Sequence, residues 1–379
     1  MNSSIVPRGW TRSIICRDLI EISFSGYSVL VMKHLRRCAL IILTILLLVG
    51  AGFFRSEIAV DRLKDVYAPL PSRFVSVAGM DIHYRDQGPA GTSPLVLLHG
   101  AFSSLHTWEA LVEQLGDERR VISVDLPGFG LTGPDPSGDY SMERSVEVLS
   151  LFLQRIQAFD SPNAQIHVGG NSLGGQIAWS YAATYPEQTA SLLLIGGASG
   201  YNEFSSPPPV LFRYVRAVAN MDLMALPLTR FTPRFLFRWN LRSAFGDAAR
   251  ITEELVTRYY QLLRREGNRS AVLARLLRSP VHDNSHVISS IRVPALILWG
   301  ERDHWIPMDH ALRFQRDIPD SRLIVLSGVG HVPMEEAPAE SAEWIEVFLS
   351  ETETVTDQVE SLTTSSLLST VSLPSSSGS

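Results

Sequence analysis

Cysteine is scarce in this chain: its 379 residues include only Cys16 and Cys38, both near the N-terminus. Neither a disulfide framework nor a paired-cysteine metal site is therefore available to a globular fold. An excess of basic residues is also lacking, because the formal net charge is −6. A general nucleic-acid-binding protein would carry a basic surface, so we expect no nucleic-acid partner. The hydrophobic content of 45% is that of a protein with a sizeable core.

Long apolar runs are lacking too, with one exception at residues 38–54. These seventeen residues carry no charge and follow the basic cluster Lys33, Arg36 and Arg37. Such a length is at the short end of what spans a bilayer as a helix, so we predict a transmembrane anchor here. Because basic residues collect on the cytoplasmic side, we expect residues 1–37 to be cytoplasmic. The remainder would then be exported, to the periplasm or the exterior.

A second interpretation of this segment stays open. The run could belong to a signal sequence that begins at Met32 and is cleaved at the small residues Val49-Gly50-Ala51, which would release a secreted protein. Residues 1–31 would then lie upstream of the natural start. We favour the uncleaved anchor, because the apolar run continues through Phe53 and Phe54, past that site.

Strand and helix patterns alternate along most of the remaining chain. After a predicted linker at 55–72, they fill residues 73–199 and return at 291–350. This alternation predicts the α/β class, with a mostly parallel twisted sheet flanked by helices. The intervening residues 200–290 have helical spacing and are rich in Arg, Leu, Phe and Tyr, so we interpret them as an inserted helical cap. The Ser/Thr-rich end, 351–379, is predicted to be disordered.

A serine lies between two glycines in the segment Gly170-Asn171-Ser172-Leu173-Gly174. An apolar strand pattern precedes this segment and a helix pattern follows it. Glycines are needed on both sides because a sharp strand-to-helix turn leaves no room for β-carbons. The turn exposes the hydroxyl and aims the first amides of the helix at the reacting centre. We therefore predict that Ser172 is a nucleophile.

Serine reacts at neutral pH only with a base, and that base needs an orienting carboxylate. Asp303 follows the predicted strand 295–299, and His331 follows the predicted strand 323–326. In an open α/β sheet, sites form at the carboxyl ends of the strands, which is where these residues and Ser172 fall. The chain order Ser172, Asp303, His331 predicts a catalytic triad with His331 as the base.

The oxyanion that forms when a serine attacks needs amide donors held in place in advance. We assign one donor to the amide of Leu173, where the predicted helix begins. The other is assigned to the amide of Ala101, in the loop after the predicted strand 94–98. His99 and Gly100 open this loop, and we expect His99 to support it rather than to act as a second base.

These motifs, together with Asp-x-Pro-Gly-x-Gly at 125–130, have the order and spacing of the α/β-hydrolase superfamily, which the chain resembles from Phe74 to Leu349. The likeness is to the branch that contains serine esterases and lipases. It implies an acyl-enzyme mechanism, a cap that shapes the pocket, and an ester or lipid-like small-molecule substrate. It also implies that no metal or organic cofactor takes part.

Two other functions stay open. Carbon–carbon bond hydrolases of the meta-cleavage-product type share the same resemblance. A non-catalytic binding protein on this fold is the third possibility, although it would not need Ser172, Asp303 and His331 together. A dinucleotide site at 128–133 is not expected, although the glycines match G-x-G-x-x-G. Prolines follow at the place where the helix of such a site should begin.

Overall fold

The computed structural model describes residues 31–44, 54–89, 93–116, 119–159, 161, 164–201, 210–219, 230, 232–278 and 285–370. It has two compact units, Met1–Phe54 and Arg55–Ser379. The first unit contains a helix over residues 31–44. Most of the predicted membrane segment 38–54 lies outside the described residues. Among the helices of the described ranges, none combines the length and the apolar character that crossing a membrane requires.

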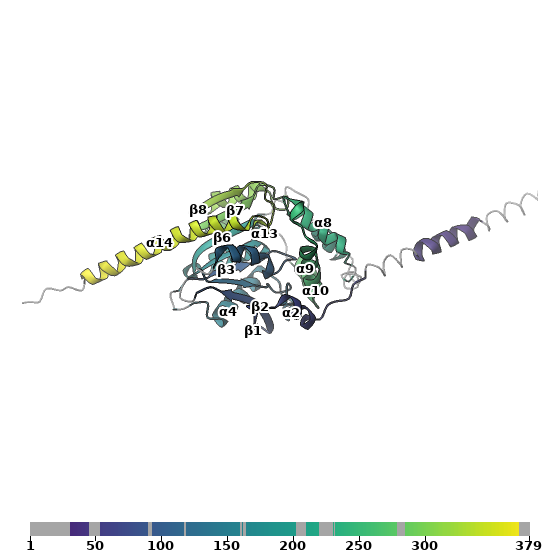
Figure 1. Ribbon diagram of the computed structural model, residues 1–379, viewed down its shortest axis with the longest axis horizontal. Coiled ribbons are helices and arrows are strands. Elements are labelled where there is room, and N and C mark those ends of the chain that lie inside the picture. The colour runs from purple at the N-terminus through teal and green to yellow at the C-terminus, as the bar shows by residue number, and fades with distance from the viewer. Residues whose placement is uncertain are drawn as a thin grey trace, which may run out of the picture. The chain divides into compact units, whose positions relative to one another are not determined.

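An eight-stranded sheet is the centre of the second unit (Figure 1). Its strand order is β1-β2-β4-β3-β5-β6-β7-β8. All neighbours from β4 to β8 are parallel, whereas β2 pairs antiparallel with β1 and β4. The predicted mostly parallel sheet is thus confirmed. The strands are β1 (Arg73–Val77), β2 (Met80–Gln87), β3 (Leu95–Leu98), β4 (Val121–Val124), β5 (Ile166–Ser172), β6 (Thr189–Ala198), β7 (Ala295–Gly300) and β8 (Ser321–Leu326).

Helices cover the sheet, which is why every residue of β3, β4 and β7 is buried. The helix Met142–Arg155 begins directly after Ser141, whose hydroxyl accepts a hydrogen bond of 3.2 Å from the Arg144 amide. The helices are η1 (Leu105–Trp108), α3 (Glu109–Leu115), α4 (Met142–Arg155), α5 (Leu173–Thr184), η2 (Pro186–Gln188), α12 (Met308–Asp317), α13 (Pro333–Glu336) and α14 (Pro338–Thr370).

The insertion between β6 and β7, the predicted cap, is mainly helical in its longer described segments. Helix α8 shows why the insertion packs onto other elements of the second unit: its Leu236, Phe237 and Leu241 recur on one side of the helix and are buried. In Figure 1 the helices α8, α9 and α10 lie together beside the sheet. The elements are α6 (Val210–Ala219), α8 (Arg234–Ala244), η4 (Ala248–Arg250), α9 (Glu253–Leu263), α10 (Asn268–Arg278) and α11 (Ser285–Ile288).

Residues 55–72, the predicted linker, contain a helix, α2 (Val60–Tyr67). Its Leu63 is buried against Leu131 and Leu262, so one side of α2 completes a small hydrophobic cluster.

The last helix, α14, runs from Pro338 to Thr370 and so extends into the Ser/Thr-rich end of the chain, 351–379, whose disorder stays a prediction. No glycine or proline occurs between residues 339 and 373, so the sequence contains no strong helix terminator there. Arg119 also ties α14 to the sheet side by ion pairs with Glu346 and Glu353. Residues 371–379 lie outside the described part.

Candidate active site

Ser172 occupies a sharp turn between β5 and α5. Its backbone has φ 54° and ψ −114°, a left-handed conformation that is costly for a residue with a side chain. The flanking glycines are required by contact distances. A β-carbon on Gly170 would lie 2.3 Å from the carbonyl carbon of Gly174, and one on Gly174 would lie 2.0 Å from the carbonyl oxygen of Leu98. The G-x-S-x-G pattern therefore has a direct steric cause.

Asp303 and His331 form a buried hydrogen-bonded pair. Nδ1 of His331 lies 2.7 Å from Oδ2 of Asp303, and each side chain is only 1% exposed. The other carboxylate oxygen, Oδ1, accepts from the amides of Trp305 at 2.8 Å and Ile306 at 2.9 Å. An ionised carboxylate only accepts, so Nδ1 must carry the proton, and neutral His331 presents an unprotonated Nε2. This Nε2 is buried and makes no hydrogen bond within the described part of the chain.

Backbone pairing brings Ser172 to this pair. Ser172 pairs with Ala198 across β5 and β6. The residue before Ala198, Gly197, faces the pair so closely that a β-carbon on it would lie 2.6 Å from Cε1 of His331 and 2.7 Å from Oδ2 of Asp303. The structure thus collects the three predicted triad residues from β5 and from the loops after β7 and β8.

Asn171 ties the serine turn to the histidine loop. Its buried amide nitrogen donates to the carbonyl of His331 at 2.9 Å and to the carbonyl of Ile195 at 3.0 Å, and it also contacts the carbonyl of Gly196. The residue next to the predicted nucleophile therefore holds the backbone of the predicted base. The amide of His331 is held independently, because it donates to the carbonyl of Ala244 at 2.6 Å.

The loop after β3 packs directly on the serine turn. A β-carbon on Gly100 would lie 2.6 Å from Oδ1 of Asn171 and 3.1 Å from Cβ of Ser172. Ala101, the predicted oxyanion donor, comes next and is partly buried. Leu173, the other predicted donor, is the first residue of α5. Both amides thus belong to segments that meet at Ser172, at a helix N-terminus that favours negative charge.

His99 uses both ring nitrogens to support this loop. Nδ1 donates to the carbonyl of Gly100 at 2.8 Å, and Nε2 accepts from the amide of Leu126 at 3.0 Å. Burial lowers the pKa of His99, the opposing influence of Asp125 being smaller. The ring is therefore neutral, and neither nitrogen is available to take a proton from a substrate.

Asp125, the first residue of the Asp-x-Pro-Gly-x-Gly motif, is a fully buried carboxylate. It accepts from the amides of Leu105 at 2.7 Å and Leu131 at 2.8 Å, and it lies 2.6 Å from Nδ1 of His83. Burial alone would raise the pKa of Asp125, but interactions with three neighbouring histidines, above all His83, lower it well below the ordinary value. The motif therefore supplies a buried anion that holds the amides of Leu105 and Leu131.

A row of aromatic rings connects the cap to the loop after β3 and to the loop after β7, which carries Asp303. Phe212 of α6 makes an edge contact with Phe102, which follows Ala101, at a centroid distance of 4.8 Å. Phe212 also approaches Trp305 at 6.3 Å, and Trp305 lies 4.8 Å from the ring of His331. This row makes the surroundings of the site apolar on the cap side.

Glu335, which follows the His331 loop, joins the cap to the segment after β3 by hydrogen bonds. Its Oε1 accepts from the Tyr259 hydroxyl of α9 at 2.7 Å and from the Thr107 hydroxyl. The Tyr259 oxygen in turn accepts from the Ser103 hydroxyl at 3.2 Å. Ser103 follows the predicted oxyanion loop, so this network couples the cap position to that loop. Burial, more than the nearby charge of Glu335, raises the pKa of Tyr259, which therefore stays protonated.

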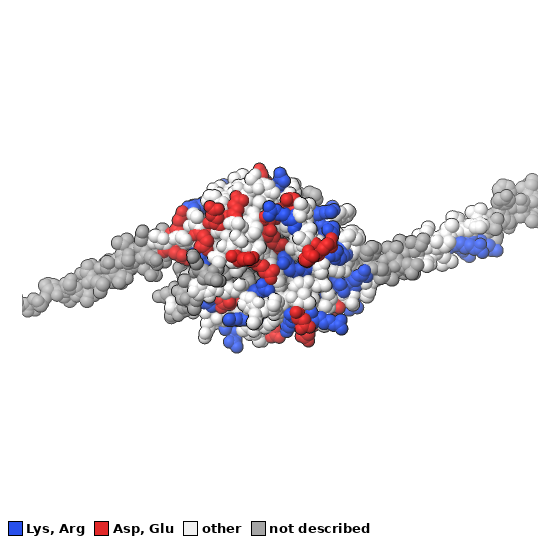
Figure 2. All heavy atoms as spheres, viewed as in Figure 1, with Lys and Arg blue, Asp and Glu red and all other residues white. Residues whose placement is uncertain are grey.

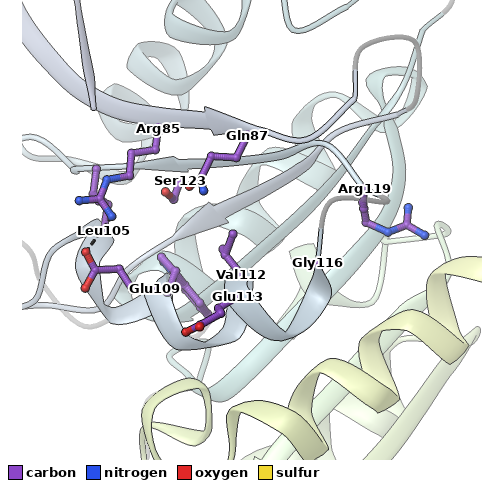
Figure 3. A pocket seen from close by; sticks show the side chains of 10 residues that line it. Arg85, Gln87, Leu105, Glu109, Val112, Glu113, Gly116, Arg119 and Ser123 are labelled. Atoms are coloured by element: carbon purple, nitrogen blue, oxygen red, sulfur yellow. Dashed lines mark hydrogen bonds and ion pairs between the residues drawn. The ribbon is translucent and has the colours of Figure 1, made fainter. Parts of the chain in front are cut away.

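No trio of histidine, cysteine or acidic side chains in the described ranges is arranged to hold a metal ion. A cavity of about 430 Å³ lies elsewhere, between β2, β4 and α3 (Figure 3). Arg85 points toward Glu109 at one end of this cavity, with 2.7 Å between Nη1 and Oε1, and Arg119 lies at the other end. The cavity includes none of the predicted site residues, so its size does not indicate where the chemistry occurs.

Several residues of the site were missed by the sequence analysis: Asn171, Gly197, Phe212, Trp305, Tyr259 and Glu335. Two of them could have been found, because Asn171 lies inside the G-x-S-x-G motif and Trp305 lies two residues after Asp303. The others carry no local signal, since their roles come from contacts between segments far apart in the chain.

A family model described as "alpha/beta hydrolase fold" matches residues 93–338. Among curated proteins, a 2-hydroxy-6-oxononadienedioate/2-hydroxy-6-oxononatrienedioate hydrolase from Burkholderia vietnamiensis is 30% identical over 272 residues, covering 69% of this chain and 89% of the relative. Lipase 1 from Psychrobacter immobilis is 27% identical, covering 72% and 82%.

A solved structure, a thermophilic esterase from Thermogutta terrifontis, superposes with a TM-score of 0.60 at 25% sequence identity. The alignment covers 74% of this chain and 97% of the esterase. The predicted fold class is confirmed by the family match and the sheet order together. These similar proteins are named as a lipase, an esterase and a hydrolase of 2-hydroxy-6-oxo dienedioates, so the fold family does not decide the substrate.

Proposed function

Since the chain belongs to the α/β-hydrolase fold family, we propose that it is a serine hydrolase that cleaves carboxylic esters through an acyl-enzyme. The observation that carries this proposal is the pairing of His331 with Asp303 beside the strained turn at Ser172. The pair leaves Nε2 of His331 as an unprotonated nitrogen with no other hydrogen bond in the described chain. Such a nitrogen is the group that a serine hydroxyl needs as its base.

The proposed reaction has two halves. Nε2 of His331 takes the proton of the Ser172 hydroxyl as the oxygen attacks the ester carbonyl, and the amides of Ala101 and Leu173 stabilise the oxyanion. The tetrahedral intermediate collapses, and the alcohol leaves with the proton from His331. Water then loses a proton to His331 and attacks the acyl group, which releases the acid and regenerates the serine. Asp303 stabilises the imidazolium in both halves.

An apolar acyl group fits the surroundings of the site. Phe102, Phe212 and Trp305 supply aromatic surface on the cap side, which favours alkyl or aryl groups over strongly polar ones. A carbon–carbon bond hydrolase is the second candidate, because a 2-hydroxy-6-oxononadienedioate/2-hydroxy-6-oxononatrienedioate hydrolase is 30% identical. The substrate in that name is a dicarboxylate, whereas Arg258, a cation of the cap, is already ion-paired with Glu109 and Glu335.

We also propose that residues 38–54 anchor the chain in a membrane, with the second unit exported. The run of uncharged residues after a basic cluster supports this proposal. Membrane fractionation of the full chain, followed by a carbonate wash, tests it. Retention in the membrane pellet is expected, and release by the wash contradicts the anchor.

Hydrolysis of nitrophenyl esters from C2 to C16 tests the chemistry, with a fluorophosphonate probe as a second readout. Ser172→Ala should abolish turnover and labelling. Ser180→Ala is the matched control, because Ser180 lies on α5 and its buried hydroxyl makes no hydrogen bond to any residue that the structure describes. This control should leave both the ester turnover and the fluorophosphonate labelling unchanged. Labelling without ester turnover would favour the carbon–carbon bond hydrolase, and inertness toward both reagents would contradict the serine mechanism.

A further inference from the structure

The cap differs in charge from the rest of the chain. Residues 200–290 contain thirteen arginines and seven acidic side chains, a net charge of +6, although the whole chain carries −6. Figure 2 shows Lys and Arg collected on the side of the globular unit that carries the cap, whereas Asp and Glu dominate the side from which α14 departs. The cap surface is therefore suited to an anionic partner.

An exposed aromatic pair lies on the outer side of α8. Phe235 and Trp239, one helical turn apart, are 51% and 56% exposed, and their rings meet edge to face at 6.1 Å. The exposed Arg242 follows on the same side of the helix. The other large hydrophobic side chains that are exposed in the described part of residues 55–370 are aliphatic and scattered over several elements. Trp and Phe beside Arg are the residues that favour a lipid headgroup region.

The start of the second unit is bonded to the same cap. The Arg55 amide donates to the carbonyl of Arg230 at 2.8 Å, and the Ile58 amide donates to the carbonyl of Arg264 at 2.8 Å. The Glu266 amide donates back to the carbonyl of Ile58 at 2.9 Å. Residues 55–58 directly follow the apolar run 38–54. The second unit therefore begins at the cap.

We infer that the outer face of α8, formed by Phe235, Trp239 and Arg242, docks on the surface of an anionic lipid bilayer. This inference rests on the proposed membrane anchor and not on the ester chemistry. The two rings enter the headgroup region, and the arginine lies near the phosphates. The anchor supplies proximity, while the aromatic pair and the cationic cap select which face of the enzyme turns toward the lipid.

The test uses the full chain in vesicles of zwitterionic lipid with and without 30% anionic lipid. Cys16 and Cys38 are replaced by serine, and a polarity-sensitive fluorophore is attached through Trp239→Cys. The matched control carries the probe through Leu151→Cys, because Leu151 is 39% exposed on α4, outside the cap. We expect a blue shift and quenching by brominated lipid at 239 but not at 151. Anionic lipid should strengthen both signals, and Arg242→Gln, which removes one positive charge, should weaken the docking of this face roughly fivefold.

Each other outcome has a defined meaning. Equal signals at 239 and 151, in protein that floats with the vesicles, refute the docking and leave the anchor standing. Protein that does not float refutes the anchor and the docking together. A blue shift at 239 that grows with protein concentration in the absence of lipid assigns the face to self-association and overturns the inference. Hydrolysis of a dissolved short-chain ester, measured on the same samples, reports on the proposed chemistry separately.

Discussion

Gly197→Ala should inactivate the enzyme without removing any catalytic group. The added methyl would lie 2.6 Å from Cε1 of His331, whereas ordinary contact begins at 3.4 Å, so the ring or the strand must move by the difference of 0.8 Å. Misplacing a catalytic group by about 1 Å costs roughly 100-fold in rate. Gly197 also has φ 53°, so an alanine there adds about 1–3 kcal/mol of backbone strain.

Gly328→Ala separates crowding from strain. Gly328 has φ 74° and lies in the loop that carries His331, but nothing is within 4 Å of the position that its β-carbon would take. Gly328→Ala should therefore lower the free energy of unfolding by about 1–3 kcal/mol, which is the cost of backbone strain, while kcat stays within about twofold. Urea unfolding, the kcat and KM of a soluble nitrophenyl ester, and the rate of fluorophosphonate labelling measure these effects. If Gly197→Ala keeps kcat within about threefold, the placement of His331 against this strand is wrong.

Three further outcomes are expected. Tyr259→Phe removes the hydroxyl between Ser103 and Glu335, so kcat should fall several-fold with little change in KM. Tyr260→Phe, whose hydroxyl donates only to the carbonyl of Thr232, should leave kcat unchanged, and equal values for both would refute the coupling. Asn171→Ala removes the amide nitrogen that donates to the carbonyls of Ile195 and His331, so it should cost about 2–4 kcal/mol in urea unfolding and lower kcat. An unaltered kcat would show that His331 needs no support from Asn171. Burial lowers the pKa of His106 from 6.5 to about 4, so between these pH values the unfolded chain binds more protons than the folded one. The free energy of unfolding should therefore fall as the pH drops from 6.5 to about 4, by up to about 3 kcal/mol. His106→Asn should flatten this part of the stability curve, and an unchanged slope would contradict the assignment.

The serine turn, the order of the triad and the sheet class could be predicted from the sequence because each depends on local chemistry. Only glycines fit on both sides of Ser172, and continuous apolar runs predict strands that are buried on both faces. Asp303 and His331 lie in the loops directly after β7 and β8, so the ends of these parallel strands fix their position at one edge of the sheet. The residues that determine these features are near neighbours in the sequence.

The supports of the site were decided only by the tertiary structure. Asn171 and the carbonyl of His331 are 160 residues apart in sequence, and Tyr259 and Glu335 are 76 apart. The cluster that buries Leu63 is likewise completed by Leu131 and Leu262, which lie far from it along the chain. A residue whose partner lies on another element carries no local pattern, so its role becomes visible only when the chain is folded.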